Sequence, residues 1–314
     1  MRTPLSEWKF EVVQDELPPW HDPDVDESRA RTALIEWAAH KLVIDRACEV
    51  IDGQVYAYGS SSVTAYGSSR VTAYDRSTVT AYGSSTVKAY GSRVYAYGSS
   101  TVYAYDRSTV YAYGIGTVYA YGSGTVKAYG SSRLYAYGSS RLYAYGSGTV
   151  TAYGSSRVKA FGSSTVYAYD SSTVYAYGSS SVMAYGSSTV TAYGSSTVTA
   201  YGSSRVTAYG SSTVYAYGSS SVMAYGSSTV TAYDRSTVYA YGSSRVTAYG
   251  SSTVYAYGSS TVKAYGSGTV KACENDATVS YCSCTEPVEP IGPHATVIDS
   301  RGDKSVVIQD EMEE

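Results

Sequence analysis

Residues 184–215 read AYGSSTVTAYGSSTVTAYGSSRVTAYGSSTVY, which is four nearly identical copies of one eight-residue motif. With small changes, the motif recurs in 28 tandem copies between Val55 and Lys271. Each copy has one apolar anchor, which is Val everywhere except at Leu134 and Leu142. A short fixed period is typical of repeat arrays, in which each unit packs on its neighbours. We therefore expect an array and not an ordinary globular domain.

Each copy is predicted to form a strand followed by a corner. The residues Thr/Arg-Val-x-Ala-Tyr alternate with period two, so Val and Ala should point inward and Tyr and the variable residue outward. The opposite phase would bury aromatic or polar positions and expose Val and Ala. Gly follows Tyr because the corner needs a positive φ. Asp tolerates that region and takes the place of Gly in four copies, at Asp75, Asp106, Asp170 and Asp234.

The predicted fold is an all-β parallel β-solenoid. Two octads make a flattened coil of 16 residues and three make a triangular coil of 24. We favour two, because Val and Ala are small enough to fill a thin interior while Ser satisfies the backbone at the corners. About 14 coils at roughly 4.8 Å each make a rod on the order of 65 Å long. The copy at Tyr90–Val94 lacks one residue, which a corner absorbs and a strand would not.

The flanking segments differ from the array and suggest three regions. Residues 1–50 form an N-terminal cap or a separate recognition module, with one helix from about Ser28 to His40 and acidic or capping residues at Asp26-Glu27-Ser28. Residues 51–272 form the solenoid. Residues 273–314 form a C-terminal cap and acidic tail, with short strands at 295–298 and 305–308. Caps are expected because the open end of a solenoid invites another chain to pair with it.

Charge divides along the chain. Residues 1–54 have a net charge of −6, residues 55–272 of +11 and residues 273–314 of −8. A basic, Tyr-rich rod suits polyanions such as nucleic acid or acidic polysaccharide. Scattered Arg and Lys also keep a β surface soluble. Odd and even copies share the cations almost evenly, so a two-octad coil has no single basic face, and this favours the solubility interpretation.

Tyr is the most regular outward residue. It occupies the position before the corner in 26 of 28 copies, with Phe161 and Cys273 as exceptions, and twelve further Tyr occupy the variable position. Stacked aromatic rows stabilise a sheet from outside and also form a rigid surface for association. The predicted interaction surface is Tyr97, Tyr105, Tyr113, Tyr121, Tyr129, Tyr137, Tyr145, Tyr153, Tyr169, Tyr177, Tyr185, Tyr193, Tyr201, Tyr209 and Tyr217.

The phrase AYGSSTVT at Ala184–Thr191 resembles the octapeptide AGYGSTLT of bacterial ice-nucleation proteins, although no Gly precedes Tyr here. The likeness covers the repeat region and implies a β-solenoid that orders water on Thr-x-Thr rows and self-associates through a Tyr ladder. Similar octads also occur in uncharacterised bacterial and phage proteins. The resemblance implies water-ordering residues at Thr189, Thr191, Thr197, Thr199, Thr229 and Thr231. Thr-x-Thr also occurs at Thr78/Thr80 and Thr149/Thr151, and the five sites fall on both odd and even copies.

Catalytic chemistry finds little support in the sequence. His21, His40 and His294 all lie outside the array, so no base stands near the corner Ser residues. Cys273, Cys282, Cys284 and His294 could supply four zinc ligands, but their spacing matches no standard finger or ribbon, and we expect thiols in a cap instead. Arg301-Gly302-Asp303 is interpreted as a turn between the terminal strands. We expect no cofactor.

We therefore predict a non-enzymatic structural or scaffolding protein that self-associates, laterally or end to end, or displays a repetitive surface. Ice binding and polyanion binding are the alternatives. No segment has the length of a transmembrane helix, and Met1–Val13 lacks the basic start and apolar core of a secretory signal. The default location is the cytoplasm, and a phage particle or unconventional export to the cell surface is the alternative.

Overall fold

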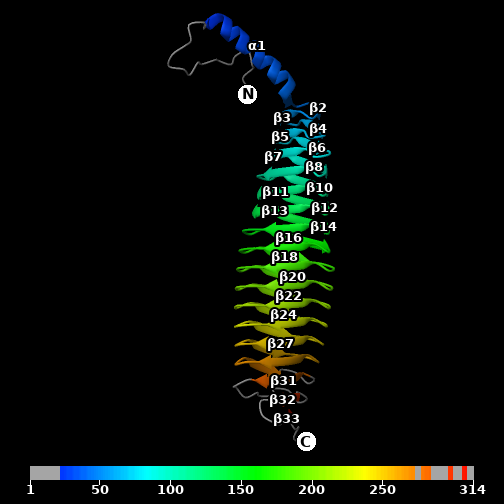
Figure 1. The fold of residues 1–314 in the computed structure, drawn as a ribbon, viewed down its shortest axis with the longest axis vertical. Helices are drawn as coiled ribbons and strands as arrows, with labels where there is room; N and C mark the ends of the chain where they lie inside the picture. Colours follow the sequence, from blue (N-terminus) through cyan, green and yellow to red (C-terminus); the bar gives the residue numbers. More distant parts are fainter. Residues whose placement is uncertain (1–21, 273–276, 284–295, 300–305, 310–314) are drawn as a thin grey trace.

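The structure, a computed structural model, describes residues 22–272, 277–283, 296–299 and 306–309. The described chain forms a long parallel β-solenoid with one helix, α1 (Pro23–Lys41), at its N-terminal end (Figure 1). Two sheets run the length of the solenoid. The strands of one sheet alternate along the chain with the strands of the other, as the predicted fold requires.

The odd-numbered strands and the last two strands form sheet A: β1 (Leu42–Ile44), β3 (Gln54–Tyr58), β5 (Arg70–Tyr74), β7 (Thr86–Tyr90), β9 (Thr101–Tyr105), β11 (Thr117–Gly122), β13 (Arg133–Gly138), β15 (Thr149–Ala152), β17 (Thr165–Ala168), β19 (Ser181–Ala184), β21 (Thr197–Ala200), β23 (Thr213–Ala216), β25 (Thr229–Ala232), β27 (Arg245–Tyr249), β29 (Thr261–Tyr265), β31 (Thr278–Ser283), β32 (Thr296–Asp299) and β33 (Val306–Gln309).

The remaining even-numbered strands form sheet B: β2 (Ala47–Ile51), β4 (Ser62–Tyr66), β6 (Thr78–Ala81), β8 (Arg93–Gly98), β10 (Thr109–Gly114), β12 (Thr125–Gly130), β14 (Arg141–Gly146), β16 (Arg157–Gly162), β18 (Thr173–Ala176), β20 (Thr189–Ala192), β22 (Arg205–Ala208), β24 (Ser221–Ala224), β26 (Thr237–Ala240), β28 (Thr253–Ala256) and β30 (Thr269–Ala272).

From β1 to β30, each strand pairs in parallel with the strand one coil away, and like positions face each other. Between β10 and β12, for example, Val110 pairs with Val126 and Tyr113 with Tyr129. Partners 16 residues apart confirm the two-octad coil. The first coil begins with β1 and β2, which pair with β3 and β4, so parallel stacking starts before residue 51.

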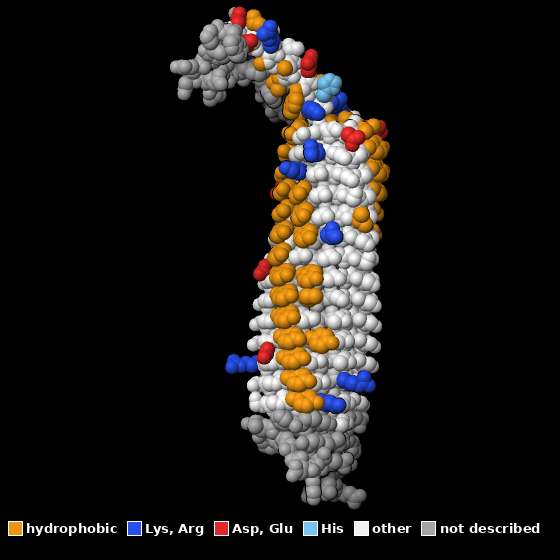
Figure 2. All heavy atoms as spheres, in the orientation of Figure 1, with side chains coloured by type: hydrophobic (Ala, Val, Ile, Leu, Met, Phe, Trp, Pro, Cys, Tyr) orange, Lys and Arg blue, Asp and Glu red, His pale blue; other side chains and the backbone are white. Residues whose placement is uncertain are grey.

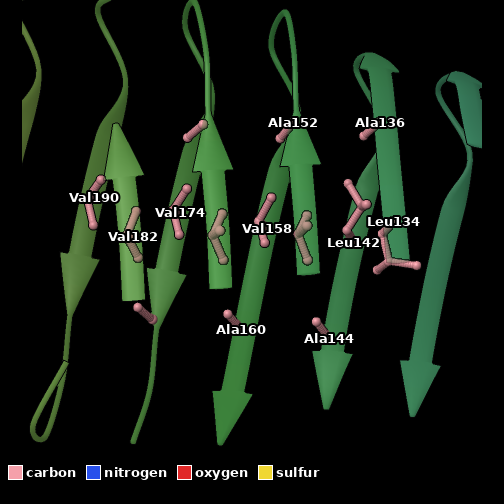
Figure 3. Packing of buried hydrophobic residues seen from close by; sticks show 14 of the residues in the cluster. Leu134, Ala136, Leu142, Ala144, Ala152, Val158, Ala160, Val174, Val182 and Val190 are labelled. Carbon is pink, nitrogen blue, oxygen red and sulfur yellow. The ribbon is translucent and has the colours of Figure 1, made fainter. Parts of the chain in front are cut away.

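The core is a single narrow layer between the two sheets. The anchor residues and the Ala two positions later are buried from Val55 to Val270, most of them completely. In Figure 3, Val174 and Val182 come from opposite sheets and point into the space between them, as do Leu134 and Leu142. The predicted inward and outward faces of each strand are confirmed. Small side chains fill the interior because the two sheets approach closely.

Buried Ser residues complete the corners. Ser196 is fully buried, and its hydroxyl donates to the carbonyl oxygen of Tyr193 at 2.9 Å and lies 3.3 Å from that of Gly178. Backbone hydrogen bonds also continue from coil to coil around the corner, as from Ser195 N–H to the Gly178 carbonyl at 2.9 Å. The corner therefore satisfies its own backbone, as expected from the Ser content.

The corner residue after Tyr has a positive φ throughout the array. Gly194 has a φ of 74°, and Asp170 and Asp234 have φ values of 60° and 59°. The Asp170 carboxylate accepts a hydrogen bond from Gly154 N–H of the preceding coil at 3.0 Å. Asp75, Asp170 and Asp234 thus each add a bond between coils, and the predicted backbone conformation is confirmed at all four Asp positions.

The single deletion in the array falls in a corner. Arg93 pairs with Thr78 and Val94 with Val79, so the strand after the deletion keeps its register. Ser92 stays buried, and its hydroxyl donates to the Tyr90 carbonyl at 3.3 Å. The corner absorbs the missing residue as predicted, because only the turn shortens.

The helix begins earlier than the sequence analysis predicts. Asp22 precedes α1 and accepts a hydrogen bond from Val25 N–H at 3.2 Å, and Pro23 occupies the first helical position. Asp22 caps the helix and Pro23 favours its first turn, so the expected start at Ser28 is wrong. Among the α1 residues whose side chains are described, 25–41, Ala38 alone is buried, and Trp37 meets Tyr56 at a centroid distance of 6.0 Å. The helix therefore contacts the solenoid through its C-terminal part.

Candidate interaction surface

Sheet A carries one continuous aromatic column, here named ladder A. Adjacent rings lie 4.6 to 5.2 Å apart between centroids, with interplanar angles of 13° or less. Stacking follows from the register, because each ring sits one coil from the next. The 14 members of ladder A are Tyr58, Tyr74, Tyr90, Tyr105, Tyr121, Tyr137, Tyr153, Tyr169, Tyr185, Tyr201, Tyr217, Tyr233, Tyr249 and Tyr265.

Sheet B carries the equivalent column, ladder B. Its centroid distances are 4.7 to 5.3 Å, and Phe161 takes its place between Tyr145 and Tyr177 without a break. The 13 members of ladder B are Tyr66, Tyr82, Tyr97, Tyr113, Tyr129, Tyr145, Phe161, Tyr177, Tyr193, Tyr209, Tyr225, Tyr241 and Tyr257. All fifteen Tyr residues predicted as an interaction surface belong to one of these two ladders.

The two ladders lie on opposite faces of the rod. Each ladder residue lies at the C-terminal end of its strand or within one residue of it, and the strands of the two sheets run in opposite directions across the coil (Figure 3). The ladders therefore also lie toward opposite edges. Figure 2 shows a hydrophobic column along the face toward the viewer, with a second, interrupted column beside it and isolated Lys and Arg.

Tyr residues at the variable position supply the second column. On sheet A, Tyr103, Tyr119 and Tyr135 stack at centroid distances of 5.0 Å and 5.0 Å beside ladder A. On sheet B, Tyr95 stacks on Tyr111 at 5.0 Å. These double rows widen the aromatic surface in the N-terminal half of the solenoid.

Stacking changes the acidity of the ladder hydroxyls. Partial burial is the largest cause that raises the pKa of Tyr113 above its ordinary value. The negative charge that Tyr97 and Tyr129 gain when they ionise raises it further. The pKa of Tyr193 is raised by the same causes, with Tyr177 as the first of its neighbours. The raised pKa values favour neutral rings, so these two hydroxyls are uncharged hydrogen-bonding groups near neutral pH.

The Thr-x-Thr sites are distributed over both faces. Thr189 and Thr191 lie on β20 of sheet B, whereas Thr197 and Thr199 lie on β21 of sheet A. Thr229 and Thr231 lie on β25 of sheet A. The strand between β21 and β25 on that sheet is β23, which carries Tyr215 at the variable position. The structure therefore brings no two of these three sites together in successive coils of one sheet.

The cations are shared by both sheets but are not evenly spaced. Those on the outward strand positions of sheet A are Arg70, Lys88, Arg133, Arg245 and Lys263. Those of sheet B are Arg93, Lys127, Arg141, Arg157, Lys159, Arg205 and Lys271. Four of the seven on sheet B fall on the consecutive strands β12, β14 and β16. Counting the cations on odd and even copies does not show this clustering, because the count ignores which copies are adjacent on one sheet.

The four residues that could supply zinc ligands lie in the C-terminal part of the chain. Cys273, Cys284 and His294 lie outside the described residues, as does the side chain of Cys282, and Arg301-Gly302-Asp303 also lies outside them. Among the residues that are described, no cluster of His, Cys, Asp and Glu could hold a metal ion. The strands on either side of the Arg-Gly-Asp segment, β32 and β33, pair in an antiparallel manner.

Searches against protein-family models, curated proteins and solved structures found no match to this chain. The helix in the described part of the chain is not long and apolar enough to cross a membrane.

Proposed function

We propose that this protein is a non-enzymatic structural or scaffolding protein whose rods associate side by side through ladders A and B. The observation that carries the proposal is the continuity of both ladders over the array. Aromatic residues are enriched where proteins associate, because they offer large contact area at a low entropic cost. A rigid row of partly exposed rings is already ordered before contact, which lowers the cost of binding.

The placement of the ladders favours open assemblies over closed dimers. A rod with one adhesive face forms pairs, whereas a rod with adhesive faces on opposite sides adds a neighbour on each. Uncharged Tyr hydroxyls can hydrogen-bond across such a contact as the ring edges meet. Lateral sheets or bundles of rods are the expected products.

Light scattering and electron microscopy of the intact protein test this proposal. In one variant Tyr185, Tyr201, Tyr217 and Tyr233 of ladder A are replaced by Thr, and in the matched control the same four are replaced by Phe. We expect bundles from the natural chain and from the Phe control. The Thr variant, with one ladder interrupted, should form assemblies no larger than pairs. Monomers of the natural chain at high concentration would contradict the proposal.

A further inference from the structure

Four cations on sheet B form a compact group, here named the basic cluster: Lys127, Arg141, Arg157 and Lys159. Arg141 and Arg157 are direct partners in the pairing of β14 with β16. Lys127 and Lys159 flank Tyr143 in the neighbouring row. The four charges therefore occupy three successive coils on one face of the rod.

Aromatic rings hold the two Lys side chains in place. The Lys127 ammonium lies 5.6 Å from the ring centroid of Tyr111 and 6.0 Å from that of Tyr143. The Lys159 ammonium lies 5.8 Å from the centroid of Tyr143 and 6.0 Å from that of Tyr175. Such contacts are attractive, and they leave both faces of Tyr143 covered by ammonium groups.

The two Arg residues have no comparable compensation. Like charges directly opposite each other in a sheet are destabilising. Among the described residues, neither Arg141 nor Arg157 forms an ion pair with a carboxylate, and strands β3 to β30 contain no Asp or Glu. Asp170, in the corner before β18, directs its carboxylate to Gly154 N–H. Dispersed cations would keep the rod soluble equally well. A role in solubility therefore does not explain why Arg141 and Arg157 are paired.

A surface depression of about 590 Å³ is lined by three of the four members of the basic cluster, all except Lys127. Its lining includes Arg141, Tyr143, Arg157, Lys159 and Tyr175. Arg141, Arg157 and Lys159 are exposed, so their charged groups are accessible to a ligand. Cations around a shallow recess concentrate positive potential where an anionic group can enter.

We propose that the basic cluster binds an acidic polysaccharide, with sulfate or carboxylate groups held by the cations and Tyr hydroxyls. Lys127 and Lys159 are two coils apart, or about 10 Å at roughly 4.8 Å per coil, which is close to one disaccharide of an extended chain. The Arg pair adds planar donors suited to oxyanions. Single-stranded nucleic acid fits less well, since it relies on open ring faces for base stacking and those of Tyr143 are covered.

The repeat allows a test that changes the position of charges without changing their number. Duplicating residues 146–153, one uncharged octad, moves Arg157 and Lys159 to sheet A, where they pair with Thr149 and Thr151, while Lys127 and Arg141 stay on sheet B. Duplicating residues 178–185, also an uncharged octad, leaves the basic cluster intact. Binding of a fluorescent heparin oligosaccharide is measured by anisotropy at low salt. We expect about a tenfold or greater loss of affinity for the first duplication only, because binding through fewer charge contacts is weaker.

A second pair of variants keeps the test valid if a duplication misfolds. Replacing Arg141, Arg157 and Lys159 by Thr, a residue common at these positions, removes three charges from the basic cluster. Replacing Arg70, Arg133 and Arg245 by Thr removes three dispersed charges from sheet A. Circular dichroism confirms that both variants fold. The first should lose heparin binding and the second should keep most of it. Equal losses would show an effect of net charge alone and would overturn the proposal.

Competitors distinguish the class of polyanion. Polygalacturonate should displace heparin from the natural chain, whereas a single-stranded DNA oligonucleotide of similar charge should displace it more weakly. Tighter binding of DNA at the basic cluster would assign the site to nucleic acid and refute the polysaccharide proposal. The basic cluster lies beside ladder B, whose Tyr177 lines the same depression, so rods packed through ladder B would cover it. Heparin binding is therefore measured at a protein concentration at which light scattering shows single rods, and loss of binding is scored separately from loss of association.

Discussion

One residue at each corner directs the chain from one sheet to the other. Gly194 has a φ of 74°, and a Cβ built there would lie 3.0 Å from the carbonyl oxygen of Gly178. At equivalent corners Asp75 and Asp106 adopt φ values of 60° and 58°. The corner therefore requires a left-handed conformation and not Gly itself. Asp tolerates this conformation, and its carboxylate can accept a hydrogen bond from a backbone N–H group.

Substitutions at Gly194 should separate these requirements. Gly194→Asp is expected to change the free energy of unfolding by less than about 0.5 kcal/mol, because its carboxylate can accept a hydrogen bond from Gly178 N–H. Gly194→Val has no such bond and should cost roughly 1–2 kcal/mol. Urea unfolding followed by circular dichroism compares the two variants. Equal stability of the Asp and Val variants would show that φ does not limit this corner.

Core positions should differ in the side-chain size they accept. Val198 and Ala200 are both fully buried on β21. Leu already occupies the anchor position at Leu134 and Leu142, so Val198→Leu should cost less than about 1.5 kcal/mol. Ala200→Leu places the same side chain where the array has Ala, and should cost up to about 3 kcal/mol by overpacking. Thermal unfolding of both variants measures the difference, and a reversed order would contradict the packing account.

At the scale of the element, each ladder is an exposed interaction surface and also stabilises its sheet through ring stacking. Tyr193 stacks on Tyr177 and Tyr209 at 5.0 Å and 5.1 Å. Phe161 stacks on Tyr145 and Tyr177 at 4.8 Å on each side. The ring, and not the hydroxyl, is thus what a ladder needs for continuity.

Replacement of Tyr193 should show this directly. Tyr193→Ala removes two stacking contacts and should lower stability by roughly 1–3 kcal/mol, at about 0.5–1.5 kcal/mol each. Tyr193→Phe keeps both contacts and should leave the thermal midpoint nearly unchanged. A Phe variant as unstable as the Ala variant would assign the stabilisation to the hydroxyl.

The strands and corners could be predicted because every copy repeats the same local rules. Period-two alternation set the buried face, and the small size of Val and Ala favoured a two-octad coil. The start of α1 was missed although Asp22-Pro23 is a helix-start signal. The basic cluster was missed for another reason. Arg141 and Arg157 are 16 residues apart, so the predicted two-octad coil already makes them neighbours. Counting the cations by odd and even copies hid this, because the count ignores their order along each sheet.

For the whole molecule, the ladders couple stability to alkaline pH. Partial burial, and then the charge of ionised neighbours, raises the pKa of Tyr121 and Tyr217 above the ordinary value. An unfolded Tyr ionises near pH 10, so above that pH the unfolded chain has released protons that the folded rod still holds. Stability is therefore retained below about pH 10 and falls as pH rises through the raised pKa values.

Thermal unfolding measured between about pH 8 and pH 11.5 tests this coupling. The midpoint should stay level up to about pH 10 and then fall, while tyrosinate absorbance should rise at a higher pH in the folded rod than in the unfolded chain. Replacing Tyr113, Tyr193 and Tyr217 by Phe removes three groups with raised pKa values, so the fall should be smaller. Ionised neighbours raise the pKa of these three rings further, as Tyr97 and Tyr129 do for Tyr113, which spreads their ionisation over a wider pH range. A single sharp titration at pH 10 would instead mean that the rings ionise independently and that the stacked ladders do not sense one another's charge.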